Sequence, residues 1–111
     1  MNLTTRLEEA ILIGIWSLGE NAYGISINKC VSQTTGKNYT MGALYFSLDR
    51  LFRNGFVNKI ARNESQEKGG RSRTYYRLTP KGKRALQEVR DYQISLWKEI
   101  PELAVDKKKT K

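Results

Sequence analysis

The chain has 111 residues and a formal net charge of +9, which favours a single basic domain that buries about two-thirds of its unfolded surface. It has no histidine and one cysteine, Cys30. These counts exclude an intrachain disulfide, the usual general base and the commonest transition-metal ligand. The carboxylates are scattered and there is no phosphate-binding glycine loop. We therefore predict a protein that is not an enzyme and has neither cofactor nor metal site.

The positive charge indicates a polyanionic partner, although charge alone leaves an anionic membrane surface or no partner open. The longest apolar stretch, residues 10–16, is far shorter than the roughly 18 to 20 residues of a membrane span. The first nine residues lack the pattern of a secretory signal. We expect a cytoplasmic protein without membrane association.

Apolar spacing predicts two helices in the first third of the chain. Residues 4–18 repeat apolar side chains every three or four positions, with Thr4 or Thr5 as N-cap. A second helix is expected over residues 24–35, and Gly36 is a suitable C-terminal stop. Its predicted apolar face consists of Ile25, Ile27, Cys30 and Val31.

A third helix is predicted over residues 41–54, after the short polar connection 37–40. Leu44, Leu48 and Leu51 form its apolar stripe. The two helices and their turn are typical of a helix-turn-helix, whose second helix presents its outer face and first residues to the major groove of DNA. Helical geometry places six residues on that outer face: Gly42, Ala43, Phe46, Asp49, Arg50 and Arg53.

Phe46 is an unusual residue on this predicted outer face. An aromatic ring there could pack against a thymine methyl group or a sugar, or against another part of the protein. The sequence leaves these alternatives open.

Residues 56–62 and 74–79 alternate as two strands of one hairpin, joined by a polar loop over 63–72. Residues 55–84 contain nine basic and two acidic side chains, so they carry seven of the nine net positive charges. Such a hairpin is typical of a DNA-binding wing, and the alternative is a solvated surface hairpin.

Thr79 and Pro80 are a strong start signal for a long fourth helix, and Pro101 stops it. Its apolar side chains exceed what one small core can cover, so we predict that it dimerises with a second copy. The predicted dimerisation residues are Leu86, Val89, Tyr92, Leu96, Trp97 and Ile100.

The predicted fold is therefore α+β and mainly α. We expect a winged helix-turn-helix domain over residues 1–78, with a two-stranded wing, and a C-terminal dimerisation helix over 79–100. Residues 101–111 form a basic tail that we expect to be disordered.

Two motifs resemble the PadR family of bacterial winged-helix transcription regulators. The first is Gly42-Ala43-Leu44-Tyr45, followed by Leu48, Arg50-Leu51 and Gly55-Phe56-Val57. The second runs from Gly70 through Arg71, Arg73 and Tyr75-Tyr76 to Thr79, and is followed by Gly82. The resemblance covers most of residues 7–97.

The resemblance implies a homodimer in which each wing and recognition helix binds half of a palindromic operator in double-stranded DNA. It implies repression of a neighbouring gene, relieved by a small molecule. On this resemblance Tyr45 binds a phosphate, Thr40, Gly42 and Ala43 lie nearest the bases, and Arg71 and Arg73 hold phosphates or enter the minor groove. The full predicted DNA-binding set is Lys37, Asn38, Thr40, Gly42, Ala43, Tyr45, Phe46, Arg50, Lys68, Arg71 and Arg73.

The chain departs from the family pattern in three places. Ile25 stands where a tyrosine is usual, Phe46 replaces a common proline, and the terminal region is short, as in the compact subgroup.

The main functional prediction is a sequence-specific DNA-binding regulator acting as a homodimeric repressor. The alternative is a winged helix that serves as a protein-interaction module. Two copies of Trp97 near a dimer axis could stack a small aromatic or cationic effector, or Trp97 could be a buried residue of the dimer core.

Overall fold

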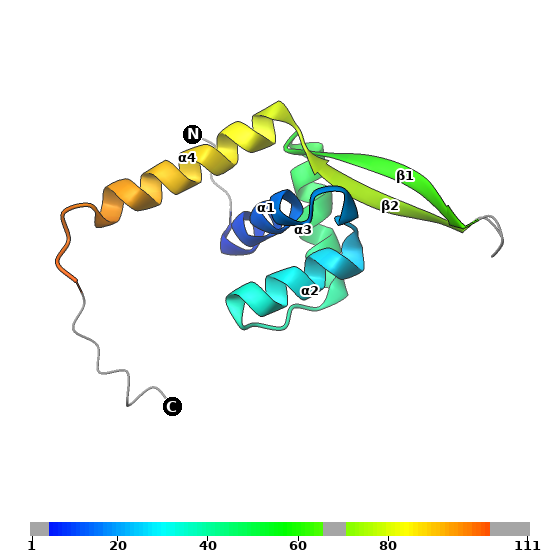
Figure 1. The fold of residues 1–111 in the computed structure, drawn as a ribbon, viewed down its shortest axis with the longest axis horizontal. Coiled ribbons are helices and arrows are strands. Elements are labelled where there is room, and N and C mark those ends of the chain that lie inside the picture. The colour runs from blue at the N-terminus through cyan, green and yellow to red at the C-terminus, as the bar shows by residue number, and fades with distance from the viewer. Residues whose placement is uncertain (1–4, 66–70, 103–111) are drawn as a thin grey trace.

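A computed structural model describes residues 5–65 and 71–102 of the chain (Figure 1). Within these ranges it has a three-helix body, a two-stranded antiparallel wing and a fourth helix. The elements follow in the order α1 (Arg6–Leu18), η1 (Gly19–Asn21), α2 (Gly24–Thr35), α3 (Met41–Arg53), β1 (Val57–Ser65), β2 (Arg71–Leu78) and α4 (Pro80–Trp97). The predicted fold, a mainly helical winged helix-turn-helix, is confirmed.

Threonine side chains start three of the four helices. Thr5 Oγ1 accepts the Glu8 N–H at 3.0 Å, and the Glu8 carboxylate accepts the Thr5 N–H at 2.9 Å, which completes a capping box. Thr40 caps α3 and Thr79 caps α4, each at 3.0 Å. Gly36 ends α2 with a φ of 74°, a conformation that favours glycine. The local signals in the sequence therefore locate these helix ends well.

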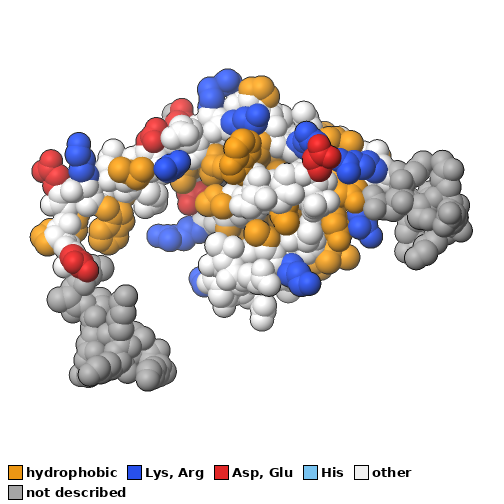
Figure 2. Space-filling view, in the orientation of Figure 1, with side chains coloured by type: hydrophobic (Ala, Val, Ile, Leu, Met, Phe, Trp, Pro, Cys, Tyr) orange, Lys and Arg blue, Asp and Glu red, His pale blue; other side chains and the backbone are white. Residues whose placement is uncertain are grey.

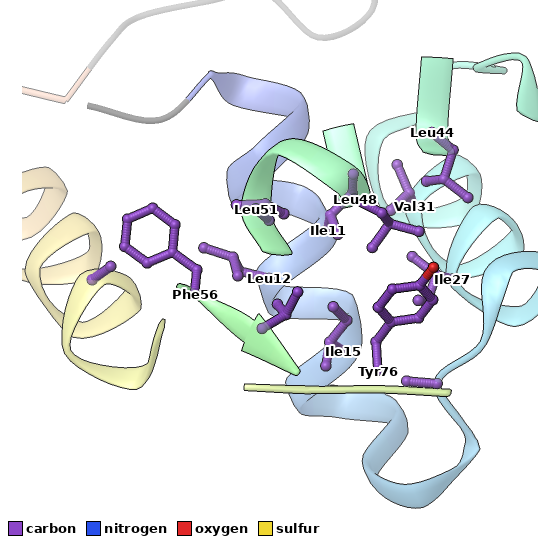
Figure 3. Packing of buried hydrophobic residues seen from close by; sticks show 13 residues of the cluster. Ile11, Leu12, Ile15, Ile27, Val31, Leu44, Leu48, Leu51, Phe56 and Tyr76 are labelled. Carbon is purple, nitrogen blue, oxygen red and sulfur yellow. The ribbon is translucent and has the colours of Figure 1, made fainter. Parts of the chain in front are cut away.

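The core lies where the three helices of the body meet the base of the wing (Figure 3). Ile11, Leu12 and Ile15 of α1 pack toward the leucine stripe of α3, while Ile27 and Val31 contribute from α2. Phe56 and Tyr76 close the core on the wing side. This packing fixes the orientation of α3, because one face of α3 is buried and the opposite face points outward.

The predicted apolar face of α2 is wrong at Ile25, whose side chain is 63% exposed. The stripe that α2 buries runs through Ile27 and Val31, four residues apart. Ile25 lies about 200° around the helix from Ile27 and therefore points away from the core.

The wing strands are longer than predicted. β1 and β2 pair from Val57 with Leu78 out to Ser65 with Arg71, with an irregularity between Asn63 and Ser65. Residues 66–70 alone connect the strands, where the sequence indicated a loop over 63–72. The alternation of apolar side chains, which the prediction used, stops before the strands end. The hydrogen bonds between the strands join backbone groups, so they continue through polar residues. The wing consequently projects well beyond the body (Figure 1).

α4 is anchored to the body only by its first turns. Gly82 and Ala85 are buried, and Leu86 is partly buried against the core. Beyond them the helix extends away from the body (Figure 1). It ends at Trp97, before the predicted end at residue 100. Beyond it the N–H groups of Lys98 and Ile100 donate to carbonyls three residues back, at 3.4 and 3.2 Å, so the last turn is tighter than an α-helix. Residues 103–111, most of the predicted basic tail, lie outside the described residues.

Candidate nucleic-acid interface

The first turn of α3 presents small side chains to solvent. Thr40, Gly42 and Ala43 were predicted to lie nearest the bases, and Thr40 and Gly42 are exposed. The Thr40 hydroxyl accepts the Ala43 N–H, so it caps the helix. A methyl group built on Gly42 would meet only Thr40 Oγ1, at 3.9 Å. The backbone of this turn can therefore approach another surface closely.

The Tyr45 ring lies over Gly24, the first residue of α2. A methyl group built on Gly24 would overlap the Tyr45 hydroxyl and lie 2.6 Å from Cζ. Gly24 therefore lets the Tyr45 ring lie against the start of α2, and a larger side chain there would displace that ring. The Tyr45 side chain is 46% exposed and joins the start of α2 to the outer side of α3.

Phe46 is the most exposed of the large apolar side chains in the described part of the chain, at 66%. The sequence left open whether its ring packs within the protein. Within a single chain the Phe46 ring is not buried. It projects from the outer face of α3, after the small residues of the first turn and before the charged residues that follow along the helix.

The charged residues of that outer face are paired within the chain. Arg50 Nε lies 3.1 Å from Oε2 of Glu8, whose side chain is only 4% exposed. Arg53 Nε lies 3.0 Å from Asp49 Oδ2, one helical turn away. Arg50 was predicted as a DNA contact. Its Nε pairs with a buried carboxylate, while its side chain remains 47% exposed.

Two arginines of the wing stack on tyrosine rings. The Arg73 guanidinium lies 4.2 Å from the ring centroid of Tyr23, and that of Arg62 lies 4.3 Å from Tyr75. Arg62 and Arg73 are direct cross-strand partners. The two tyrosines meet edge to face, with centroids 5.4 Å apart. The four side chains therefore form one alternating cluster on one face of the wing, beyond its base.

Sequence reasoning missed Tyr23, because it precedes α2 and belongs to no periodic pattern. An isolated bridge pairs it with Tyr75, and the Tyr76 N–H donates to the Ala22 carbonyl at 2.8 Å. The chain before α2 is thus joined to β2 at this one position. The one feature of the sequence that could have pointed to Tyr23 is its position next to Gly24, the glycine that starts α2.

The remaining predicted DNA-binding residues are distributed around this face. Lys37 and Asn38 are exposed in the connection between α2 and α3. Lys68 and the Arg71 side chain lie outside the described part of the structure. Figure 2 shows blue lysine and arginine side chains on the wing and others spread over the body and α4.

Burial changes the ionisation of one residue under this surface. It raises the pKa of Tyr76 above its ordinary value of 10.0, and the nearby Tyr45 and Asp49 raise it further. Among residues 5–65 and 71–102, no cluster of three side chains could hold a metal ion. No helix in those same ranges is long and apolar enough to cross a membrane.

The arrangement of recognition helix and wing agrees with the comparison to known families. The sequence model of the Transcriptional regulator PadR-like family matches residues 12–88. The chain belongs to the PadR-like family. It is a DNA-binding transcriptional regulator and not an enzyme, as the sequence predicted. No curated protein sequence matches the chain.

Solved PadR structures share the fold. A PadR family regulator from Clostridium difficile R20291 is 21% identical, with a TM-score of 0.67, and the match covers 86% of this chain and 94% of that one. A PadR-like regulator from Bacillus cereus ATCC 14579 is 24% identical, with a TM-score of 0.70 and coverage of 85% and 86%. A PadR family regulator from Eggerthella lenta DSM 2243 is 28% identical, with a TM-score of 0.64 and coverage of 81% and 76%.

Proposed function

We propose that this PadR-like protein is a homodimeric repressor that binds a palindromic operator. In each half-site the first turn of α3 enters the major groove, and the wing binds the DNA backbone beside it. The Arg62, Arg73, Tyr23 and Tyr75 cluster is the observation that carries the proposal. The two arginines stand at directly paired positions of the strands, so they place two cations side by side on the wing, and a row of phosphates is a suitable partner for such a surface.

The stacked tyrosines also prepare the arginines for binding. A guanidinium held over a ring loses fewer conformations when it meets a phosphate. Tyr45 and the exposed Lys37 and Asn38 supply further polar groups around α3. These residues fit phosphate contacts that orient α3 over the bases.

Dimerisation is proposed from the apolar side chains of α4 beyond its anchored turns. Tyr92, Ile94, Leu96 and Trp97 are 48 to 55% exposed, and Ile100 is 52% exposed just past the helix. Figure 2 shows orange side chains along this extended segment, far from the core. Ile13 and Trp16 of α1 are also exposed. A second copy would cover such surfaces and place two recognition helices in a symmetric arrangement.

Operator affinity at different salt concentrations tests the electrostatic part of the proposal. A dimer making about 6 to 10 phosphate contacts should lose roughly 10³ to 10⁵ in affinity between 50 and 200 mM salt. Replacing both Arg71 and Arg73 with alanine should reduce the salt slope. Binding that does not respond to salt would exclude this mechanism.

The alternative function is a winged helix that binds another protein. It predicts that the Arg71→Ala, Arg73→Ala double variant keeps its main partner. Retrieval of genomic DNA fragments by the wild-type protein, and loss of that retrieval in the double variant, distinguishes the proposed regulator from the interaction module.

A small effector would relieve repression by binding between two copies of Trp97. The competing assignment for Trp97 is a buried residue of the dimer core. Titration of planar aromatic and cationic compounds, in a variant with Trp16 replaced, reports on Trp97 alone through its fluorescence. Quenching accompanied by release of DNA supports the effector site, and absence of quenching across a broad panel opposes it.

A further inference from the structure

The outer face of α3 has an apolar centre. Phe46 lies about 40° around the helix from Gly42 and about 60° from Ala43, so these three residues form the part of the face nearest the helix start. Neither Gly42 nor Ala43 has a polar side chain, and Phe46 is 66% exposed. A DNA surface that meets this turn meets a ring and small apolar groups.

Several polar side chains near this centre have partners within the chain. Thr40 Oγ1 accepts the Ala43 N–H and keeps one O–H to donate. Met41 Sδ lies 3.1 Å from Asn28 Nδ2. Arg50 is paired with Glu8, and Arg53 with Asp49. The two arginines also lie about 6 Å and 10 Å beyond Phe46 along the helix axis, beyond the turn that is nearest the bases in this type of motif.

We infer that Phe46 determines operator specificity by packing against the C5-methyl group of thymine in the major groove. Thymine alone among the four bases presents a methyl group there, and aromatic and small apolar side chains are its usual partners. The inference rests on the proposed function, because it requires that α3 enters the major groove. The positive charge of residues 55–84 provides the attraction that brings this apolar face to DNA.

Deoxyuridine provides the test, since it keeps every hydrogen-bonding group of thymine and lacks only the methyl. An operator is first selected from genomic fragments, and each of its thymines is then replaced singly. At one or two positions in each half-site, wild-type affinity should fall about fourfold, the value for one buried methyl group. Symmetric replacement in both half-sites should lower it about fifteenfold.

The same duplexes are then bound by three variants. Phe46→Ala should bind the thymine and deoxyuridine duplexes equally at the sensitive position, whereas Phe46→Leu should retain part of the discrimination. Phe52→Ala is the matched control, because it removes another exposed phenylalanine from α3, one that stacks on Lys59 4.5 Å away. It should discriminate as the wild type does, and circular dichroism verifies that each variant is folded.

Two results would overturn the inference. In one, wild-type protein binds every deoxyuridine operator as tightly as the parent operator. In the other, Phe46→Ala retains the full discrimination. These results differ from a failure of the proposed function itself. If the protein does not bind DNA specifically, no genomic fragment is selected at all.

Discussion

The carboxylate of Glu8 closes the capping box of α1 and also binds Arg50 of α3, with 3.1 Å between Oε2 and Nε. One nearly buried side chain therefore ties the start of the first helix to the outer face of the recognition helix. Glu8→Ala should lower the free energy of unfolding by about 2 to 3 kcal/mol, because it removes a helix cap and a charged hydrogen bond. Urea denaturation measures this loss.

Glu8→Gln separates the two contributions. Its amide can still accept the Thr5 N–H and complete the capping box, but it has no charge for Arg50. The loss should therefore be smaller than in Glu8→Ala. Equal losses in the two variants would mean that the ion pair alone stabilises this junction.

Two glycines in helices should respond to alanine with opposite signs. Gly42 is exposed and its surroundings are open, so Gly42→Ala should stabilise the protein by about 0.5 to 1 kcal/mol through helix propensity. A methyl group at Gly82 would overlap the Phe56 carbonyl, so Gly82→Ala should destabilise it by about 1 to 3 kcal/mol. Thermal unfolding of both variants checks the signs, and a stabilised Gly82→Ala protein would contradict the packing of α4 on residue 56.

Tyr76 should make stability sensitive to alkaline pH. Its pKa is raised in the folded state, so its contribution is fully present below the unfolded pKa of about 10 and is lost as pH rises through the folded value. The free energy of unfolding should therefore fall above about pH 10. Because lysines titrate in the same range, the comparison is with Tyr76→Phe, which should show a shallower decline. Parallel curves for the two proteins would refute the assignment.

Tyr23 should act on DNA binding through Arg73. Tyr23→Phe keeps the ring under the guanidinium and should bind operator normally, whereas Tyr23→Leu should weaken binding about two- to fivefold. In an Arg73→Ala background, Tyr23→Leu should have no further effect. Fluorescence anisotropy with a labelled operator gives the affinities of the wild type and of these variants, and simply additive losses would show that Tyr23 acts elsewhere.

Trp97 should control the oligomeric state. Trp97→Ala removes a large, half-exposed side chain from the surface proposed for dimerisation, and it should shift the protein toward monomer. Ile25→Ala is the control, because Ile25 is also apolar and is 63% exposed, against 54% for Trp97, but lies on α2. Sedimentation velocity measures both. A wild-type protein that is monomeric at micromolar concentration would exclude the proposed dimer.

Local signals in the sequence predicted most of the fold. Thr5 and Thr79 cap helices where expected, and the leucine stripe of α3 is buried as its spacing indicated. The sequence could not show contacts between residues far apart in the chain. The pairing of Glu8 with Arg50 and the stacking of Arg73 on Tyr23 arise only when separate elements meet, so they leave no periodic pattern. Strand length was underestimated for a similar reason, because backbone pairing continues after apolar alternation ends.

A footprint on a selected genomic fragment tests the central claim most directly. Wild-type protein should protect two symmetric half-sites about one helical turn of DNA apart, or a multiple of that spacing, and excess unrelated DNA should not abolish the protection. Uniform protection that disappears with unrelated competitor would contradict sequence-specific binding by α3 and the wing.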